Sequence, residues 1–168
     1  MSIIQTSDFG SGQYAIPQDK FTQLASYITK FERKYLLHLL GVELYDLFIA
    51  DLTGPTPQVP QTQIYLDFFN EFHLEIDGCN LTSEGIKEML KAFIYFHWMR
   101  DATYRKTTFG VTTSSAENAT NNIYQGFNLV EAYNQGVDIA NSIQWFIQDN
   151  EAVYPLFDGD LFEFTSGI

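Results

Sequence analysis

The sequence predicts an all-α fold: a small helical bundle with a long C-terminal helix, a short β-hairpin or loop insertion, and extended terminal arms. Three observations favour this fold. Apolar residues recur at three- and four-residue steps along most of the chain, which is the spacing of one helix face. Glycine and proline gather between these stretches, where helices end. The 168 residues, of which 45% are hydrophobic, fit one domain with one core.

The expected single domain (1–168) divides into three parts by composition. Residues 1–16 mix Ser, Gly and Gln with a few apolar residues, which predicts an extended arm that can become ordered on a neighbouring subunit. Residues 17–150 carry the helical spacing and form the bundle. Residues 151–168 combine a proline and a glycine with aromatic and acidic side chains, which predicts an extended tail.

The first helix of the bundle is expected over residues 18–40. Pro17 suits a first helical turn, and Gly41 is typical of a C-cap. The apolar stripe of this helix consists of Phe21, Leu24, Ile28, Phe31 and Tyr35. A second helix should follow over 42–52. The next eight residues must form a loop, because their three prolines and one glycine prevent the helix from continuing.

The middle of the chain predicts two further helices with an extended segment between them. Residues 61–72 have helical spacing, whereas residues 73–82 alternate before an Asp-Gly pair and favour a short strand or turn. Thr82 or Ser83 is suited to cap the next helix. That helix is apolar on more than half its circumference, which is typical of a helix at the centre of a bundle.

A β-branched segment and a long helix complete the bundle. Residues 107–115 are rich in threonine and predict a protruding loop or small β-hairpin. The long helix is expected over about 116–150 and would span roughly 50 Å if unbroken. Its glycines, Gly126 and Gly136, either permit close contact with another helix or mark a kink.

The chain is strongly acidic, with a net charge of −12 and only 9 Lys and Arg residues. Proteins that grip nucleic acid need cations to displace phosphate counterions, so specific nucleic-acid binding is not expected. Docking on an anionic membrane is disfavoured for the same reason. The single cysteine, Cys79, cannot form an internal disulfide and suits a reducing cytoplasm. The N-terminal residues lack the pattern of a secretion signal.

The chain is rich in aromatic residues, with 15 Phe, 10 Tyr and 2 Trp. Aromatic side chains bury large areas and are enriched at protein interfaces. Their abundance fits either a protein that packs against partners or a phenylalanine-rich core, and both interpretations stay open. The same choice applies to the tail, which fits a ligand for another protein's surface or a segment packed on its own bundle.

The sequence offers no recognisable catalytic or cofactor-binding motif. The three histidines, His38, His73 and His97, lack the i+4 partner that a zinc-protease pair needs, and Cys79 has no second cysteine. Nucleophile-elbow, P-loop and dinucleotide motifs are missing from the sequence. We therefore expect no enzyme activity, cofactor or metal. The alternative is a small helical-bundle enzyme with a metal bound by His38, His97 and a carboxylate.

Three stretches carry a combined pattern of aromatic, charged and leucine positions. The first is Tyr27-Ile-x-x-Phe31-Glu-x-x-Tyr35-Leu-x-x-Leu39-Leu40-Gly41, followed by Leu44-Tyr45-x-Leu47-Phe48. The second is Gly85-Ile-Lys-Glu-Met-Leu-Lys-Ala-Phe-Ile-Tyr-Phe-His-Trp-Met-Arg-Asp101, which leads into the threonine-rich segment with Gly110-Val111. The third is Ala116-Glu117-Asn118-Ala119, which opens the long helix. Over residues 17–150 this pattern resembles the head–tail connector (adaptor) proteins of tailed bacteriophages.

The resemblance implies a structural virion protein, made in the host cytoplasm and located in the neck. Copies would form a homo-oligomeric ring beneath the portal protein, contact the next connector or tail protein, and extend a channel through which DNA passes without specific binding. Portal docking would involve the tail residues Tyr154, Phe157, Phe162 and Phe164. Subunit contacts would involve Thr108, Phe109, Gly110 and Val111. Another neck or tail-completion protein is the alternative within the virion.

Overall fold

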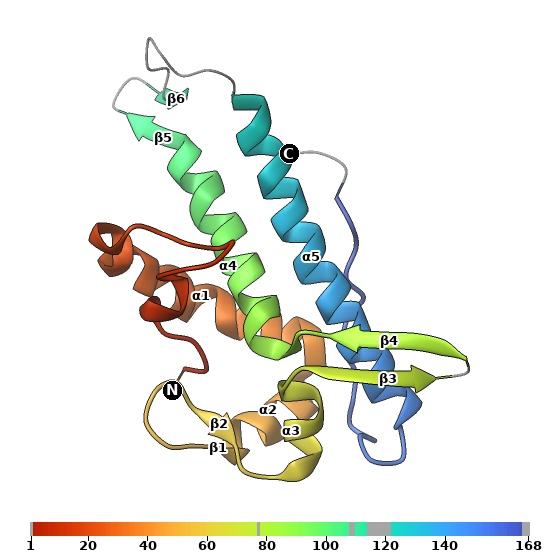
Figure 1. Cartoon of the computed structure of the whole chain (residues 1–168). Helices are drawn as coiled ribbons and strands as arrows, with labels where there is room; N and C mark the ends of the chain where they lie inside the picture. The colour runs from red at the N-terminus through yellow and green to blue at the C-terminus, as the bar shows by residue number, and fades with distance from the viewer. Residues whose placement is uncertain (1, 77, 108–109, 114–121, 166–168) are drawn as a thin grey trace.

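The computed structural model describes residues 2–76, 78–107, 110–113 and 122–165, and these contain five α-helices and three two-stranded antiparallel sheets (Figure 1). The helices are α1 (Phe21–Leu40), α2 (Val42–Asp51), α3 (Gln63–Phe69), α4 (Gly85–Thr103) and α5 (Asn122–Asp149). The strands pair as β1 (Leu52–Thr53) with β2 (Val59–Pro60), β3 (Phe72–Ile76) with β4 (Cys79–Ser83), and β5 (Tyr104–Thr107) with β6 (Gly110–Thr113).

The prediction of an all-α fold is wrong, because the chain is mixed α/β, although mostly helical. Each sheet pairs two extended segments that lie close together in the sequence. In the β3–β4 hairpin, Leu74 pairs with Leu81 and Phe72 with Ser83. The ring of Phe72 packs 5.2 Å from that of Phe146 on α5, so the hairpin is anchored on the helices.

Helices α4 and α5 pack along each other and α1 packs against α4, which forms the centre of the fold (Figure 1). Gly136 on α5 explains the close approach, because a Cβ atom there would lie 3.0 Å from the Phe93 ring of α4. Gly136 therefore permits close contact with another helix, which is one of the two interpretations of this residue given above. The side chains of Phe93, Ile94 and Val137 are completely buried in the core.

The N-terminal segment lies on the bundle, where we expected an extended arm. Residues Thr6–Phe9 form a 3₁₀ helix, and Ile3, Ile4 and Phe9 are buried. The carboxylate of Glu32 on α1 accepts hydrogen bonds from the Ser2 hydroxyl at 2.6 Å and from the Ile3 amide at 3.0 Å. Burial raises the pKa of Glu32. This buried acceptor fixes the start of the chain against the bundle.

No helix in the described part of the chain combines the length and apolar character of a membrane span.

Candidate functional site

The C-terminal segment returns along α5 and is held there by side-chain amides (Figure 1). Gln144 donates to the Asp160 carbonyl at 2.8 Å, and Asn141 donates to the Phe162 carbonyl at 3.4 Å. Asn134 donates to the Thr165 carbonyl and accepts from the Thr165 amide, at 3.0 and 2.9 Å. The hydrogen bonds of these three side chains are to backbone atoms of the segment, so they fix the course of its backbone.

The same segment completes the C-terminal end of α1. The last carbonyls of a helix have no partner within the helix and need one elsewhere. The Asp160 amide donates to the His38 carbonyl at 2.9 Å, and the Asp158 amide donates to the Leu40 carbonyl at 3.3 Å. Gln144 donates to the Leu39 carbonyl at 3.0 Å. The tail and α5 together therefore cap α1.

Two glycines allow these backbones to meet. Gly41 ends α1 with φ at 77°, and a Cβ atom there would lie 2.6 Å from the Asp158 backbone. A Cβ atom on Gly159 would overlap the Leu39 carbonyl oxygen. Any larger residue at either position would push the tail away from α1.

The four aromatic residues predicted to dock on the portal occupy different environments. Phe162 is buried, with its ring 5.5 Å from Phe93 and 6.3 Å from Tyr35. Tyr154 is also buried and donates its hydroxyl to the Ile64 carbonyl at 2.6 Å. Phe157 is half-buried against the core. Phe164 alone among the four is exposed, at 58%.

Sequence reasoning missed the aliphatic side chains that the tail exposes. Leu161 is 77% exposed, and Leu156 and Val153 are 40% and 47% exposed. In the extended stretch, Leu161 points outward while the next residue, Phe162, points into the core. The alternation does not continue to Phe164, which lies two residues after Phe162 and is exposed, so the spacing of residues alone does not separate the two roles.

The predicted subunit-contact loop falls partly outside the described residues. Thr108 and Phe109 are among the residues that the structure does not describe. Gly110 and Val111 open β6 and pair with Thr107 and Lys106 on β5.

The two histidines of the alternative metal site have separate partners. The His97 ring is buried, stacked on Phe31 at 3.8 Å, with Nε2 2.7 Å from the Tyr35 hydroxyl. Burial, followed by nearby Arg100 and Lys34, lowers the pKa of His97 to about 4. His38 lies 3.4 Å from the Asp160 carboxylate. Within the described residues, no group of three or more His, Cys, Asp or Glu side chains could hold a metal ion.

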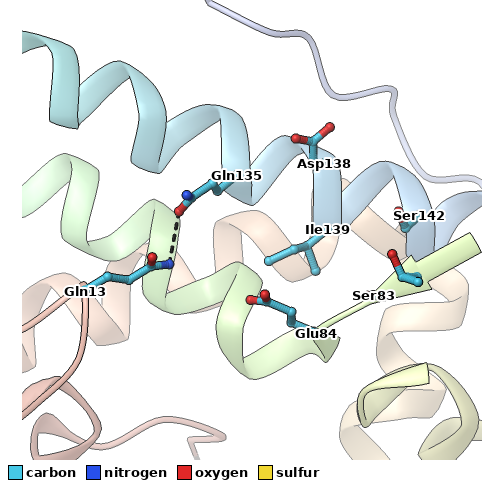
Figure 2. Close-up of a pocket in the computed structure, with 8 residues that line it drawn as sticks. Gln13, Ser83, Glu84, Gln135, Asp138, Ile139 and Ser142 are labelled. Carbon is cyan, nitrogen blue, oxygen red and sulfur yellow. Dashed lines mark hydrogen bonds between the residues drawn. The ribbon is translucent and has the colours of Figure 1, made fainter. Parts of the chain in front are cut away.

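A polar groove of about 570 Å³ opens between the N-terminal segment, α5, β4 and Glu84, the residue that joins β4 to α4 (Figure 2). Its lining is Gln13, Thr82, Ser83, Glu84, Gln135, Asp138, Ile139 and Ser142. We call it the acidic groove, because it carries Glu84 and Asp138 and none of its lining residues is basic. Gln13 donates to Gln135 at 3.0 Å across one end, as Figure 2 shows.

The negative charge extends beyond the lining of the acidic groove. Tyr14 donates its hydroxyl to Gln135 at 2.7 Å. Burial raises the pKa of Tyr14, and nearby Glu84, Glu88 and Glu131 raise it further. Several carboxylates therefore act on the same small region of the surface. This arrangement suits a positively charged partner.

Comparisons with protein-family models, with curated proteins and with solved structures found no match to the chain.

Proposed function

We propose that this chain is a head–tail connector (adaptor) of a tailed bacteriophage, which forms a ring beneath the portal and extends the DNA channel to the tail. The resemblance over residues 17–150 supports this role. The observation that carries the proposal is the exposure of Leu161 and Phe164, at 77% and 58%, on a tail whose backbone is fixed to the bundle. A segment whose backbone is already fixed loses less conformational entropy when a partner covers its side chains.

The charge of the chain suits a channel wall. The net charge of −12 repels the phosphates of DNA, so DNA can slide past the protein without adhering to it. The ring would surround the genomic DNA without making specific contacts to its bases.

Burial changes which tail residues we propose for the portal contact. Tyr154 and Phe162 are buried in the core and Phe157 is half-buried against it, so we propose that docking involves Leu161 and Phe164. Deleting residues 151–168 would therefore be an ambiguous test, because it would remove core side chains and the cap of α1 together with the docking surface. Point substitutions separate the two effects.

The test is the double variant Leu161→Ser/Phe164→Ser. We expect it to fold like the original chain, since both side chains are exposed, and to lose co-purification with the portal ring of the same phage. The control is Val59→Ser/Leu74→Ser, which removes two exposed apolar side chains, 42% and 38% exposed, from β2 and β3. Circular dichroism checks folding, and electron microscopy of the complexes locates the protein.

The outcomes separate the alternatives within the virion. Loss of portal binding only in the tail variant supports the proposal. Equal binding by both variants contradicts the tail assignment. A protein that never joins the portal but occurs elsewhere in the neck or tail of the particle is the alternative neck or tail-completion protein. A protein absent from virions contradicts the proposed function altogether.

A further inference from the structure

A strip of positive charge on α1 has no acidic partner within the described residues. We call Lys30, Arg33 and Lys34 the basic strip; all three are exposed, and none forms an ion pair there. Three other cations do form such pairs: Lys20 with Asp19, Lys91 with Glu88, and Arg100 with Asp101. Lys87 on α4 forms no ion pair within the described residues either, but it lines a pocket together with Glu84 and Glu88. The chain has 21 acidic residues for 9 basic ones, so unpaired cations are unexpected.

The two lysines of the basic strip lie over buried aromatic rings. The Lys30 ammonium lies 5.0 Å from the Phe31 ring centroid, and the Lys34 ammonium lies 5.4 Å from that of Tyr35. Both rings are buried, so each ammonium rests on a fixed aromatic face. Arg100 on α4 lies on the same side, because it acts with both lysines on the His97 ring, but its partner Asp101 acts there too with the opposite sign. The unpaired positive charge where α1 packs on α4 therefore comes from the lysines of the basic strip.

The acidic groove faces away from the basic strip. Glu88, beside the groove, and His97, beside the strip, are both on α4 and are nine residues apart. At about 100° per residue, nine residues place two side chains on opposite faces of a helix. The acidic groove and the basic strip therefore lie on opposite sides of α4 in one subunit.

We propose that the basic strip of each subunit docks on the acidic groove of the next copy, an inference that rests on the proposed ring. Two chains of charge −12 repel each other, so a contact between them is favoured where it joins opposite charges. A contact between two different faces is heterologous, and repeating it generates a closed ring when the rotation fits. The groove accommodates lysine and arginine side chains because its polar lining offers Glu84 and Asp138 as acceptors.

The experiment is a charge exchange with two double variants. The strip variant is Lys30→Glu/Lys34→Glu, and the groove variant is Glu84→Lys/Asp138→Lys. Each alone should need more than about tenfold higher concentration for half-assembly than the original chain, because like charges would then meet. A mixture of the two variants should assemble again, since the acidic strip of one matches the basic groove of the other. Light scattering after size-exclusion chromatography and native mass spectrometry measure assembly, alone and with the portal ring.

A matched control separates the local effect from net charge. Glu75→Lys/Glu151→Lys changes the net charge as the groove variant does, but at exposed positions outside both faces. We expect this control to assemble like the original chain. Circular dichroism confirms that all variants fold, so loss of assembly cannot reflect unfolding.

Each outcome decides the proposal. Restored assembly in the mixture, with little assembly by either variant alone, supports it. Undiminished assembly of a single variant, or a mixture that stays dissociated, overturns it while leaving the proposed ring intact through other faces. If the original chain neither self-associates nor joins a portal, the proposed function and this inference both fail.

Discussion

The clearest consequence of the structure is that the tail belongs to the fold, and Phe162→Ala tests this. Phe162 is 6% exposed and packs near the rings of Tyr35, Phe93 and His38. Replacing a buried phenylalanine by alanine costs about 3–5 kcal/mol, from lost apolar burial and from the cavity left behind. Phe164→Ala, two residues away but exposed, should change stability by less than about 0.5 kcal/mol.

Hydrogen bonds to its backbone hold the tail on α1 and α5, so part of this loss of stability can appear as local release of the tail. Global stability is measured by urea unfolding, followed by circular dichroism. Local release is measured by hydrogen exchange of the Asp158, Asp160 and Thr165 amides, which donate to Leu40, His38 and Asn134. We expect Phe162→Ala to accelerate exchange at all three amides. Equal unfolding midpoints and equal exchange in the two variants would refute the reasoning.

Two further predictions concern the tail contact and acid stability. Gly159→Ala should destabilise the protein by about 1–3 kcal/mol, because the added Cβ atom would overlap the Leu39 carbonyl oxygen. Hydrogen exchange of the Asp160 amide measures this effect. We expect faster exchange in the variant, and unchanged exchange would contradict the prediction. The pKa of His97 falls from 6.5 to about 4, so its stabilising contribution is present above pH 6.5 and is lost as pH falls through about 4. At 1.36 kcal/mol per pKa unit, this contribution of His97 to stability is up to about 3 kcal/mol. The free energy of unfolding of His97→Gln, measured with urea, should therefore depend less on pH between 6.5 and 4 than that of the original chain.

The helices could be predicted because their signals are local. The spacing of apolar residues and the glycine at position 41 place α1 and α2 within a few residues of their observed ends. Of the residues predicted as a long helix, 122–149 form α5, while 116–121 lie outside the described residues. The strand or turn predicted in 73–82 is a hairpin, and counting it as a minor connection led to the incorrect all-α class.

The terminal segments could not be placed from local pattern alone. Burial of Ile3 depends on a carboxylate 29 residues away, and burial of Phe162 depends on rings from α1 and α4. Composition described both segments as extended, which is nearly right for the backbone of the tail. It carried no information about the surface on which each segment lies, because that surface is assembled only by the fold.

The aromatic residues resolve a question that composition left open, and the answer bears on how subunits would associate. Most of the described aromatic rings form the core, whereas Trp145 and Phe164 are the large aromatic side chains exposed within the described residues. A ring of these subunits therefore has few aromatic anchors to offer and must depend more on charge. Charge attraction between exposed groups is screened over about 10 Å at 0.1 M salt. Assembly through the basic strip and the acidic groove should consequently weaken as salt rises, whereas portal docking through Leu161 and Phe164 should persist. Loss of ring assembly at high salt with portal docking retained would thus distinguish the two contacts within one complex.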